Sequence, residues 1–149
     1  MHSAKAFAPG NISCIFVIKK TKNPAKSGSL GMGFTVNKGV IVTIKKLYNN
    51  KPIKKISDNH DKKNKNRIYF NGKKFNFPTV NSVLSKLTDE KVVVDIKSDF
   101  PLGMGLGISG AAALATAYAL NKLLNLKKSK KQLAMIAHIA EVENSTGLG

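Results

Sequence analysis

The sequence has 149 residues, of which 42% are hydrophobic, so it is long enough to form one globular domain with a buried core. Its formal net charge is +17, and Cys14 is its single cysteine, which excludes an intrachain disulfide. The first residues lack the charged region and long apolar region of a signal peptide, so we expect a cytoplasmic protein without membrane contact.

The positive charge has two interpretations. Clustered lysines neutralise phosphates, so one of them is a nucleic-acid-binding domain. Arg67 is the single arginine, however, and bidentate contacts with base edges need arginine most. Aromatic residues, which would stack on bases, are few. We therefore favour a lysine-rich solvated surface that could steer anionic substrates.

The N-terminal third is rich in β-branched and apolar residues. Residues 4–18 predict two strands with a turn at Pro9-Gly10 between them. A polar loop and a glycine-rich turn follow, and the apolar residues up to position 44 predict a further hairpin about residues 37–39.

The most polar part of the chain comes next. Asn71-Gly72, placed between two aromatic pairs, predicts a two-residue hairpin turn. Asp58, His60 and Asp61 are potential metal ligands, but no partner ligands follow at suitable spacing, so we interpret them as a solvated loop. A nucleic-acid contact would also lie in this stretch.

The second half contains the motif around which we interpret the chain. Apolar spacing predicts a helix over 79–87 and a β-branched strand over 91–97. Glycines at positions 103, 105, 107 and 110 then lead into an alanine-rich helix that ends near Asn125. A helix N-terminus leaves N–H groups unpaired, and glycine lets a phosphate approach them. The order strand, glycine-rich loop, helix therefore predicts an anion-binding loop, in which Ser109 could offer a hydroxyl to a phosphate or to Mg²⁺.

Other interpretations of this loop compete with that one. The simplest is a glycine-rich turn before a core helix. A dinucleotide-binding fold needs an acid about 20 residues further on, but no acid occurs between Asp99 and Glu141. A Walker loop needs a lysine after the glycines, which is missing here. The uncharged run 100–121 is long enough for a membrane span but only weakly apolar, so we do not favour a span.

The last helix begins with a predicted capping box of Ser129 and Gln132. Glu141 and Glu143 lie at the two edges of its apolar stripe, so helical periodicity does not choose between them. We interpret His138 as a surface or core-edge histidine.

Three segments resemble motifs of the GHMP kinase superfamily. The run Pro101-Leu-Gly-Met-Gly-Leu-Gly-Ile-Ser-Gly-Ala-Ala resembles the superfamily's phosphate loop, and Ala8-Pro-Gly-Asn-Ile resembles its opening motif. Residues 28–34, with the pattern GS-x-G-x-GF, resemble a segment of archaeal pantoate kinases. The resemblance implies that ATP is held by the loop residues Pro101, Gly103, Gly105, Leu106, Gly107, Ser109, Gly110 and Ala111. It also implies an acceptor pocket shaped by Pro9, Gly10, Asn11, Ser29 and Gly31.

Two positions depart from the pantoate kinase pattern. Asn11 stands where those kinases usually have histidine, and Leu30 stands where they usually have a basic residue. If that basic residue binds the carboxylate of pantoate, another cation must replace it here. The candidates are Lys19, Lys20 and Lys38.

The resemblance also implies a metal site and a fold. Ala137-His-Ile-Ala-Glu-Val-Glu-Asn resembles the family helix that supplies a Mg²⁺-binding carboxylate, with Glu141 as the better match and Glu143 as the runner-up. Ser109 and Glu141 would then hold Mg²⁺. The implied fold is α+β, with a mostly antiparallel sheet and helices on one face, of the left-handed βαβ type shared with a ribosomal small-subunit protein. The implied reaction is phosphoryl transfer from ATP to the hydroxyl of pantoate, in coenzyme A synthesis.

The resemblance spans nearly all 149 residues but only about the first half of a typical family member. The aspartate that the family uses as base or charge stabiliser would follow Gly149, so no catalytic residue is assigned within the chain. We expect residues 1–149 to be an N-terminal ATP-binding domain with little kinase activity alone, and a homodimer stays open. The alternatives are a basic nucleic-acid-binding domain of the ribosomal-protein-like fold, or a non-catalytic half that needs a partner chain.

Overall fold

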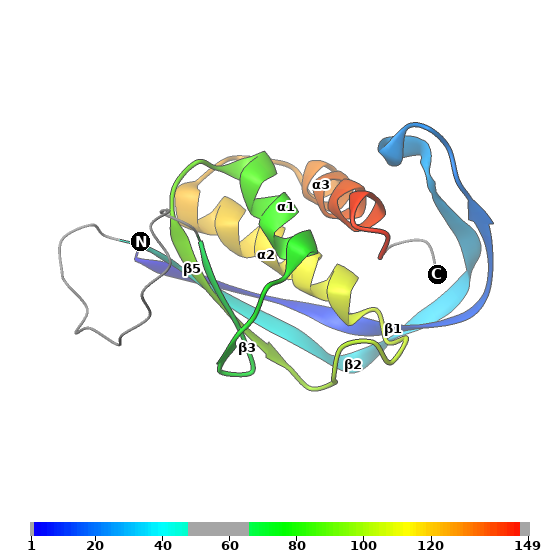
Figure 1. Cartoon of the computed structure of the whole chain (residues 1–149), viewed down its shortest axis with the longest axis horizontal. Coiled ribbons are helices and arrows are strands. Elements are labelled where there is room, and N and C mark those ends of the chain that lie inside the picture. Colours follow the sequence, from blue (N-terminus) through cyan, green and yellow to red (C-terminus); the bar gives the residue numbers. More distant parts are fainter. Residues whose placement is uncertain (1, 48–65, 147–149) are drawn as a thin grey trace.

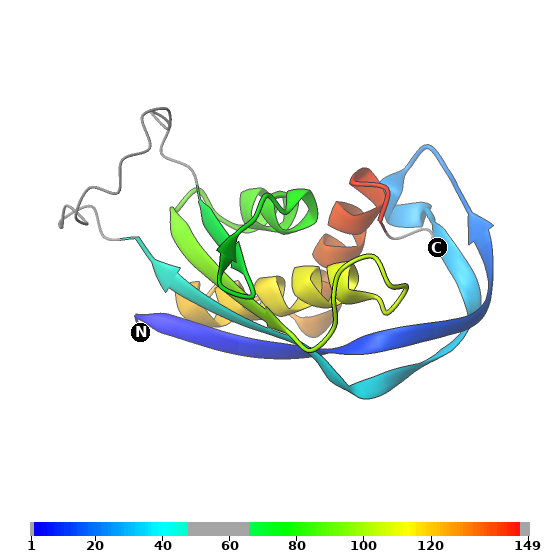
Figure 2. The ribbon, with the colours of Figure 1, turned by 60° about the horizontal axis from the view of Figure 1, so that its bottom comes forward.

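The computed structural model describes residues 2–47 and 66–146. They form a five-stranded sheet in the order β1-β2-β5-β3-β4, and its helices cover one face (Figures 1 and 2). The elements in chain order are β1 (Ser3–Lys19), the 3-10 helix η1 (Pro24–Lys26), β2 (Gly28–Lys46), β3 (Arg67–Phe70), β4 (Lys73–Lys74), α1 (Pro78–Leu87), β5 (Val92–Ser98), α2 (Ile108–Leu124) and α3 (Lys130–Glu143). Of the strand pairs, β3 with β5 is parallel and the others are antiparallel, so the predicted α+β class is confirmed.

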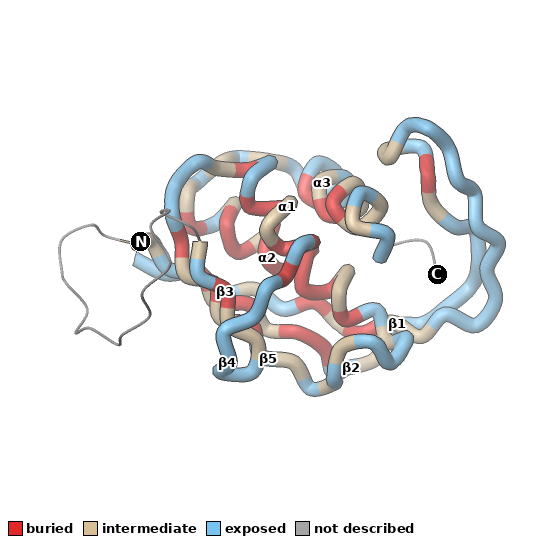
Figure 3. The backbone as a smooth tube through the Cα atoms, in the orientation of Figure 1, coloured by how far each residue is buried: buried red, intermediate tan, exposed pale blue. Residues whose placement is uncertain are grey.

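The core lies between the centre of the sheet and the helices (Figure 3). On β5 and on the part of β2 that pairs with it, residues 40–46, every second residue is buried toward the helices, as the two-residue period of a strand requires. Burying each such side chain stabilises the fold by roughly 1.5–3 kcal/mol. The fully buried residues of these two strands are Val40, Val42, Ile44, Val92, Val94 and Ile96.

Helix α2 contacts the sheet and both of the other α-helices. It is apolar on almost every side, as expected for a helix enclosed by other elements. Most of its buried residues are alanines, which allow the neighbouring backbones to approach closely: Ala111, Ala112, Ala113, Ala115, Ala117 and Ala119.

The predicted turn at Pro9-Gly10 is wrong, because β1 runs without interruption through both residues. Instead the strand contains an irregularity, with register shifts between Pro9 and Asn11 and again between Ser13 and Ile15. A bulge tolerates the missing N–H of proline, which a regular ladder position does not. Gly39 lies opposite Pro9, and a Cβ atom there would overlap the carbonyl oxygen of Ala8.

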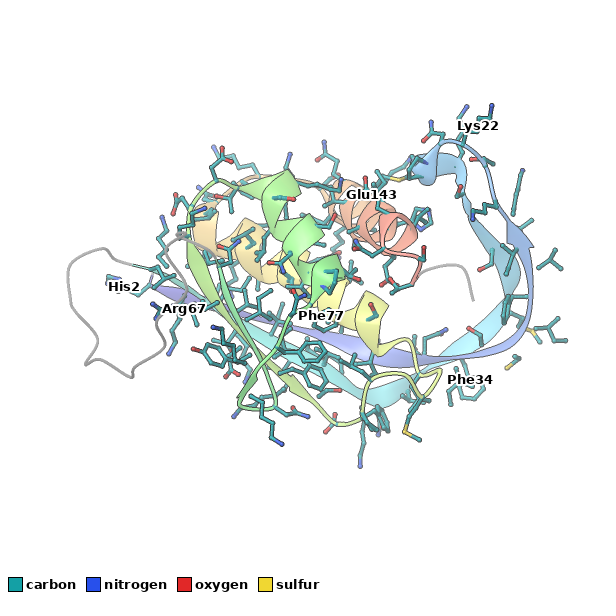
Figure 4. The ribbon with its side chains drawn as sticks, viewed as in Figure 1. His2, Lys22, Phe34, Arg67, Phe77 and Glu143 are labelled. Carbon is teal, nitrogen blue, oxygen red and sulfur yellow. The ribbon has the colours of Figure 1, made fainter. Side chains whose placement is uncertain are left out.

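The predicted hairpin about residues 37–39 is also wrong, and so is the glycine-rich turn before it, because β2 is continuous. The chain reverses earlier, at η1. There the side chain of Asn23 accepts the N–H of Ala25 at 3.0 Å. Beyond the body of the sheet, residues 11–19 and 28–35 therefore form a two-stranded arm, which we call the distal ribbon. It curves away from the sheet, and its far end, near Lys22, returns toward α3 (Figures 1 and 4).

Several local predictions are confirmed. Asn71 and Gly72 have φ values of 48° and 79° and connect β3 to β4. The helix predicted over 79–87 is α1, and α2 ends at Asn125 in the left-handed conformation. Both hydrogen bonds of the capping box at the start of α3 are present.

Two further expectations concern the membrane and the polar segment. Among the described residues, no helix has the length and apolar character to cross a membrane. Asp58, His60 and Asp61 lie outside the described residues.

Candidate nucleotide-binding and metal site

The glycine-rich loop between β5 and α2 is fixed at both of its ends. At its entry, Gly39 N–H donates to Asp99 Oδ2 at 2.9 Å, and Asp99 N–H donates to Gly39 O at 3.0 Å. At its exit, Asn11 N–H donates to Leu106 O at 2.9 Å. The loop is therefore held by β2 at one end and by the irregular part of β1 at the other.

The glycines of the loop serve its backbone conformation. Gly103, Gly105 and Gly107 have φ values of 83°, 69° and 63°, in the region that other residues rarely adopt. A Cβ atom at Gly103 or Gly105 would meet nothing within 4 Å, so the space beside these residues is open. At Gly107 a Cβ atom would lie 3.3 Å from Asn11 Cβ.

The first turn of α2 has backbone N–H groups that no described residue accepts. Gly107 is the N-cap residue, and no side chain caps the helix. The first helical hydrogen bond runs from Ala111 N–H to Gly107 O, so the N–H groups of residues 108–110 have no partner within the helix. Together with the positive end of the helix dipole, they suit a phosphate group.

A carboxylate from α3 reaches this helix start. Ser109 Oγ donates to Glu141 Oε1 at 2.7 Å. A Cβ atom at Gly110 would lie 2.8 Å from Glu141 Oε2, too close for a real contact. Gly110 therefore makes room for the carboxylate, and the structure brings together the two residues that we expected to hold Mg²⁺.

Two threonines complete this group. Thr146 Oγ1 donates to Glu141 Oε1 at 2.8 Å. Thr79 Oγ1 lies 3.4 Å from both Ser109 Oγ and Thr146 Oγ1, and the residue is only 2% exposed. We call Thr79, Ser109 and Thr146 the hydroxyl cluster. Sequence reasoning missed both threonines, because threonine is common at the ends of helices and its presence there does not indicate a metal or nucleotide site.

Glu143 belongs to a different contact. Its carboxylate forms a salt bridge with Lys86 Nζ at 2.9 Å and accepts a hydrogen bond from Ser82 Oγ at 3.0 Å. Both partners lie on α1, and Figure 4 shows Glu143 at the end of α3 that faces this helix. The hydrogen bond from Lys86 lowers the pKa of Glu143. Of the two glutamates that periodicity could not separate, Glu141 is thus the one beside the loop.

The expected acceptor residues fall into two groups. Pro9, Gly10 and Asn11 lie beside the loop, and a Cβ atom at Gly10 would lie 3.3 Å from Leu106 O. Ser29 and Gly31 lie on the distal ribbon, where they pair with Ile18 and Phe16. A Cβ atom at Gly31 would overlap Ile15 O, so the packing of the ribbon alone already requires glycine there.

A shallow pocket lies between the far end of the ribbon and α3. Ser29 and Leu30 line it, together with Lys19 and Lys26. His138, also in its lining, donates from Nε2 to the carbonyl oxygen of Ser27 at 2.7 Å. Of the three lysines proposed to replace a basic residue at position 30, Lys19 is the one in this lining. Because residues three apart share a helix face, α3 presents His138 and Glu141 on the same side.

The family model described as "GHMP kinases N terminal domain" matches residues 76–149, which include the loop, α2 and α3. A solved structure described as "Phosphotransferase related to CoA biosynthesis pathway" superposes on 99% of the chain with a TM-score of 0.80 and 30% identity, and the match covers 48% of that structure's chain. The chain therefore belongs to the GHMP kinase superfamily and has the fold of its N-terminal domain.

Within the superfamily, the chain is similar to pantoate kinases. It is 40% identical over 147 residues to the pantoate kinase of Methanocaldococcus jannaschii, a match that covers 96% of the chain and 47% of that protein. It is 32% identical over 151 residues to the pantoate kinase of Methanospirillum hungatei, with 97% and 47% covered. The chain thus spans about half the length of the curated relatives that it matches.

Proposed function

We propose that the chain is the ATP-binding part of a kinase that transfers a phosphoryl group from ATP to the hydroxyl of pantoate and yields 4-phosphopantoate. The observation that carries the proposal is the contact between Ser109 and Glu141 at the start of α2, directly after a glycine-rich loop. The pantoate kinases that share up to 40% identity with the chain support the choice of acceptor.

The loop and α2 would hold the phosphates of ATP. The open space beside Gly103 and Gly105 leaves room for them, and the N–H groups of residues 108–110 are available as donors. The links through Asp99 and Asn11 fix the loop before the nucleotide arrives, so binding does not have to order it.

Ser109 and Glu141 would hold Mg²⁺. A carboxylate and a hydroxyl are hard oxygen donors, and Mg²⁺ in kinases takes few protein ligands because phosphates and waters supply the others. When bound at these two residues, the ion would supply positive charge against the negative charge that develops in phosphoryl transfer. The residues present therefore fit the metal.

The acceptor would lie between the loop and the distal ribbon. Pro9, Gly10 and Asn11 form the boundary next to the loop, and Ser29 belongs to the pocket that also contains Lys19. We propose that Lys19 faces the carboxylate of pantoate, in place of the basic residue missing at position 30. The positive net charge attracts both anionic substrates.

The experiment is a titration of the chain with a fluorescent ATP analogue, with and without Mg²⁺, on wild type and on a matched pair of variants. Glu141→Gln removes the carboxylate beside the loop, and Glu143→Gln makes the same change at the α1 contact. We expect Glu141→Gln to raise the Mg²⁺ concentration at half-binding about ten-fold or more, and Glu143→Gln to leave it unchanged within about two-fold.

The proposal is contradicted if the wild-type chain binds no nucleotide, or if both variants behave alike. Binding of RNA that weakens steeply with salt, without nucleotide binding, would favour the nucleic-acid alternative. To test the acceptor, pantoate is added to the complex, and we expect it to tighten analogue binding more than an equal concentration of acetate does.

A further inference from the structure

We propose that Thr79 is a positioning residue of the metal site, and that its hydroxyl accepts the hydrogen bond of Ser109 when Glu141 faces a cation. This inference rests on the function proposed above. It assigns a role to a residue of α1, a helix from which neither the loop nor the carboxylate comes.

The first step is the position of the Ser109 proton. A serine hydroxyl has one proton and two lone pairs. Two acceptors are within reach of it, Glu141 Oε1 at 2.7 Å and Thr79 Oγ1 at 3.4 Å. Without a cation the shorter, charge-assisted bond to Glu141 is the stronger one.

The second step concerns the cation. An oxygen that coordinates a cation directs a lone pair toward it, so its proton must point elsewhere. A carboxylate that faces the same cation is a poorer acceptor for that proton. Thr79 Oγ1 is then the remaining acceptor that the structure places beside Ser109.

The third step is the surroundings of Thr79. The residue is 2% exposed, so water does not readily compete for its hydroxyl. Its own proton can be donated to Thr146 Oγ1 at 3.4 Å, and Thr146 donates to Glu141. A hydroxyl that donates on one side keeps its lone pairs for Ser109 on the other.

A second buried threonine provides a matched control. Thr116, on α2, is 0% exposed, and its hydroxyl has no hydrogen-bond partner among the described residues. Replacement of either threonine by valine keeps the shape and removes one buried hydroxyl. The two substitutions therefore differ in whether that hydroxyl has a role.

The test measures binding of the fluorescent ATP analogue across a range of Mg²⁺ concentrations. We expect Thr79→Val to raise the Mg²⁺ concentration at half-binding about five-fold, as for the loss of one hydrogen bond, and Thr79→Ser to restore it to within about two-fold of wild type. Thr116→Val leaves it unchanged. With Mg²⁺ chelated, Thr79→Val binds the analogue as wild type does. Urea unfolding without ligands checks that each variant folds.

The outcomes are distinguishable. If Thr79→Val weakens nucleotide binding equally with and without Mg²⁺, or if its Mg²⁺ midpoint does not move, Thr79 has a purely structural role and the inference is overturned. The same holds if Thr79→Ser does not rescue binding. If the wild-type chain shows no Mg²⁺-dependent binding, the proposed function itself fails and the inference falls with it.

Discussion

His138 Nε2 donates a hydrogen bond to Ser27 O, 2.7 Å away and 111 residues earlier in the chain. This contact fastens the far end of the distal ribbon to α3, the helix that carries Glu141. Ser27 is itself buried. Its hydroxyl accepts a hydrogen bond from the N–H of Thr21 and donates one to the carbonyl oxygen of Thr21. The end of the ribbon is thus a small ordered unit rather than a loose loop.

We expect His138→Ala to loosen that unit. Loss of the hydrogen bond removes about 1 kcal/mol from its anchoring, so the amides of residues 21–28 should exchange with solvent several-fold faster. Hydrogen exchange followed by mass spectrometry measures this directly. His138→Gln keeps a side-chain donor and serves as the control. If His138→Ala exchanges these amides no faster than wild type does, the side chain does not hold the ribbon.

Glycines with positive φ provide a second matched pair. Gly105→Ala and Gly72→Ala introduce the same backbone strain, about 1–2 kcal/mol, into open space at two different turns. Both variants should lose similar stability in urea unfolding. Only Gly105→Ala should also weaken binding of the ATP analogue, by about ten-fold or more. Equal binding by the two variants would move the nucleotide away from the loop.

The glycine-rich loop is anchored at its entry by a hydrogen-bond acceptor, Asp99 Oδ2, and this role does not need the negative charge of the carboxylate. Asp99 Oδ2 accepts the N–H of Gly39, so Asp99→Asn keeps the bond and Asp99→Ala removes it. We expect Asp99→Ala to weaken nucleotide binding about five-fold and Asp99→Asn to stay within about two-fold of wild type. If the two variants weaken binding equally, the negative charge is what matters, and the anchoring role is wrong.

The contact between Glu143 and Lys86 makes stability depend on pH. Because its pKa is lowered in the folded chain, Glu143 contributes stability above its unfolded pKa and loses that contribution as the pH falls through the folded pKa. Lys86→Met removes the effect. The stability difference between wild type and Lys86→Met, about 0.5 kcal/mol or less for a pair this exposed, should shrink from about pH 7 to about pH 3. A difference that grows on acidification would contradict this sign.

The parts of the fold that were predictable are those with local causes. Asn71-Gly72 forms its turn because both residues tolerate positive φ, and Ser129 with Gln132 caps α3 through neighbours three residues apart. The loop before α2 was recognisable because its conformation needs positive φ at several positions, and the sequence has glycine at those positions.

The parts that were missed depend on distant partners. Pro9-Gly10 resembles a turn, but pairing with β2 along the whole strand overrides that preference and turns it into an irregularity. Thr79 and Thr146 join Ser109 and Glu141 only because α1, α2 and α3 pack together. Periodicity placed Glu141 and Glu143 equally well, and the position of α1 separates them.

The small side chains of α2 have a consequence for variation at a distance. This helix contacts both the sheet and α3, and Ala112, Ala113 and Ala117 within it are 0% exposed. Their small side chains let α2 pack closely against its neighbours, one of which is the helix that carries Glu141. A bulkier residue at such a position would push α2 away from a neighbouring element, and where that element is α3 it would change the distance between Ser109 and Glu141. We therefore expect substitutions in the apolar interior of α2 to change the affinity of the proposed Mg²⁺ site, although they lie outside its set of polar residues.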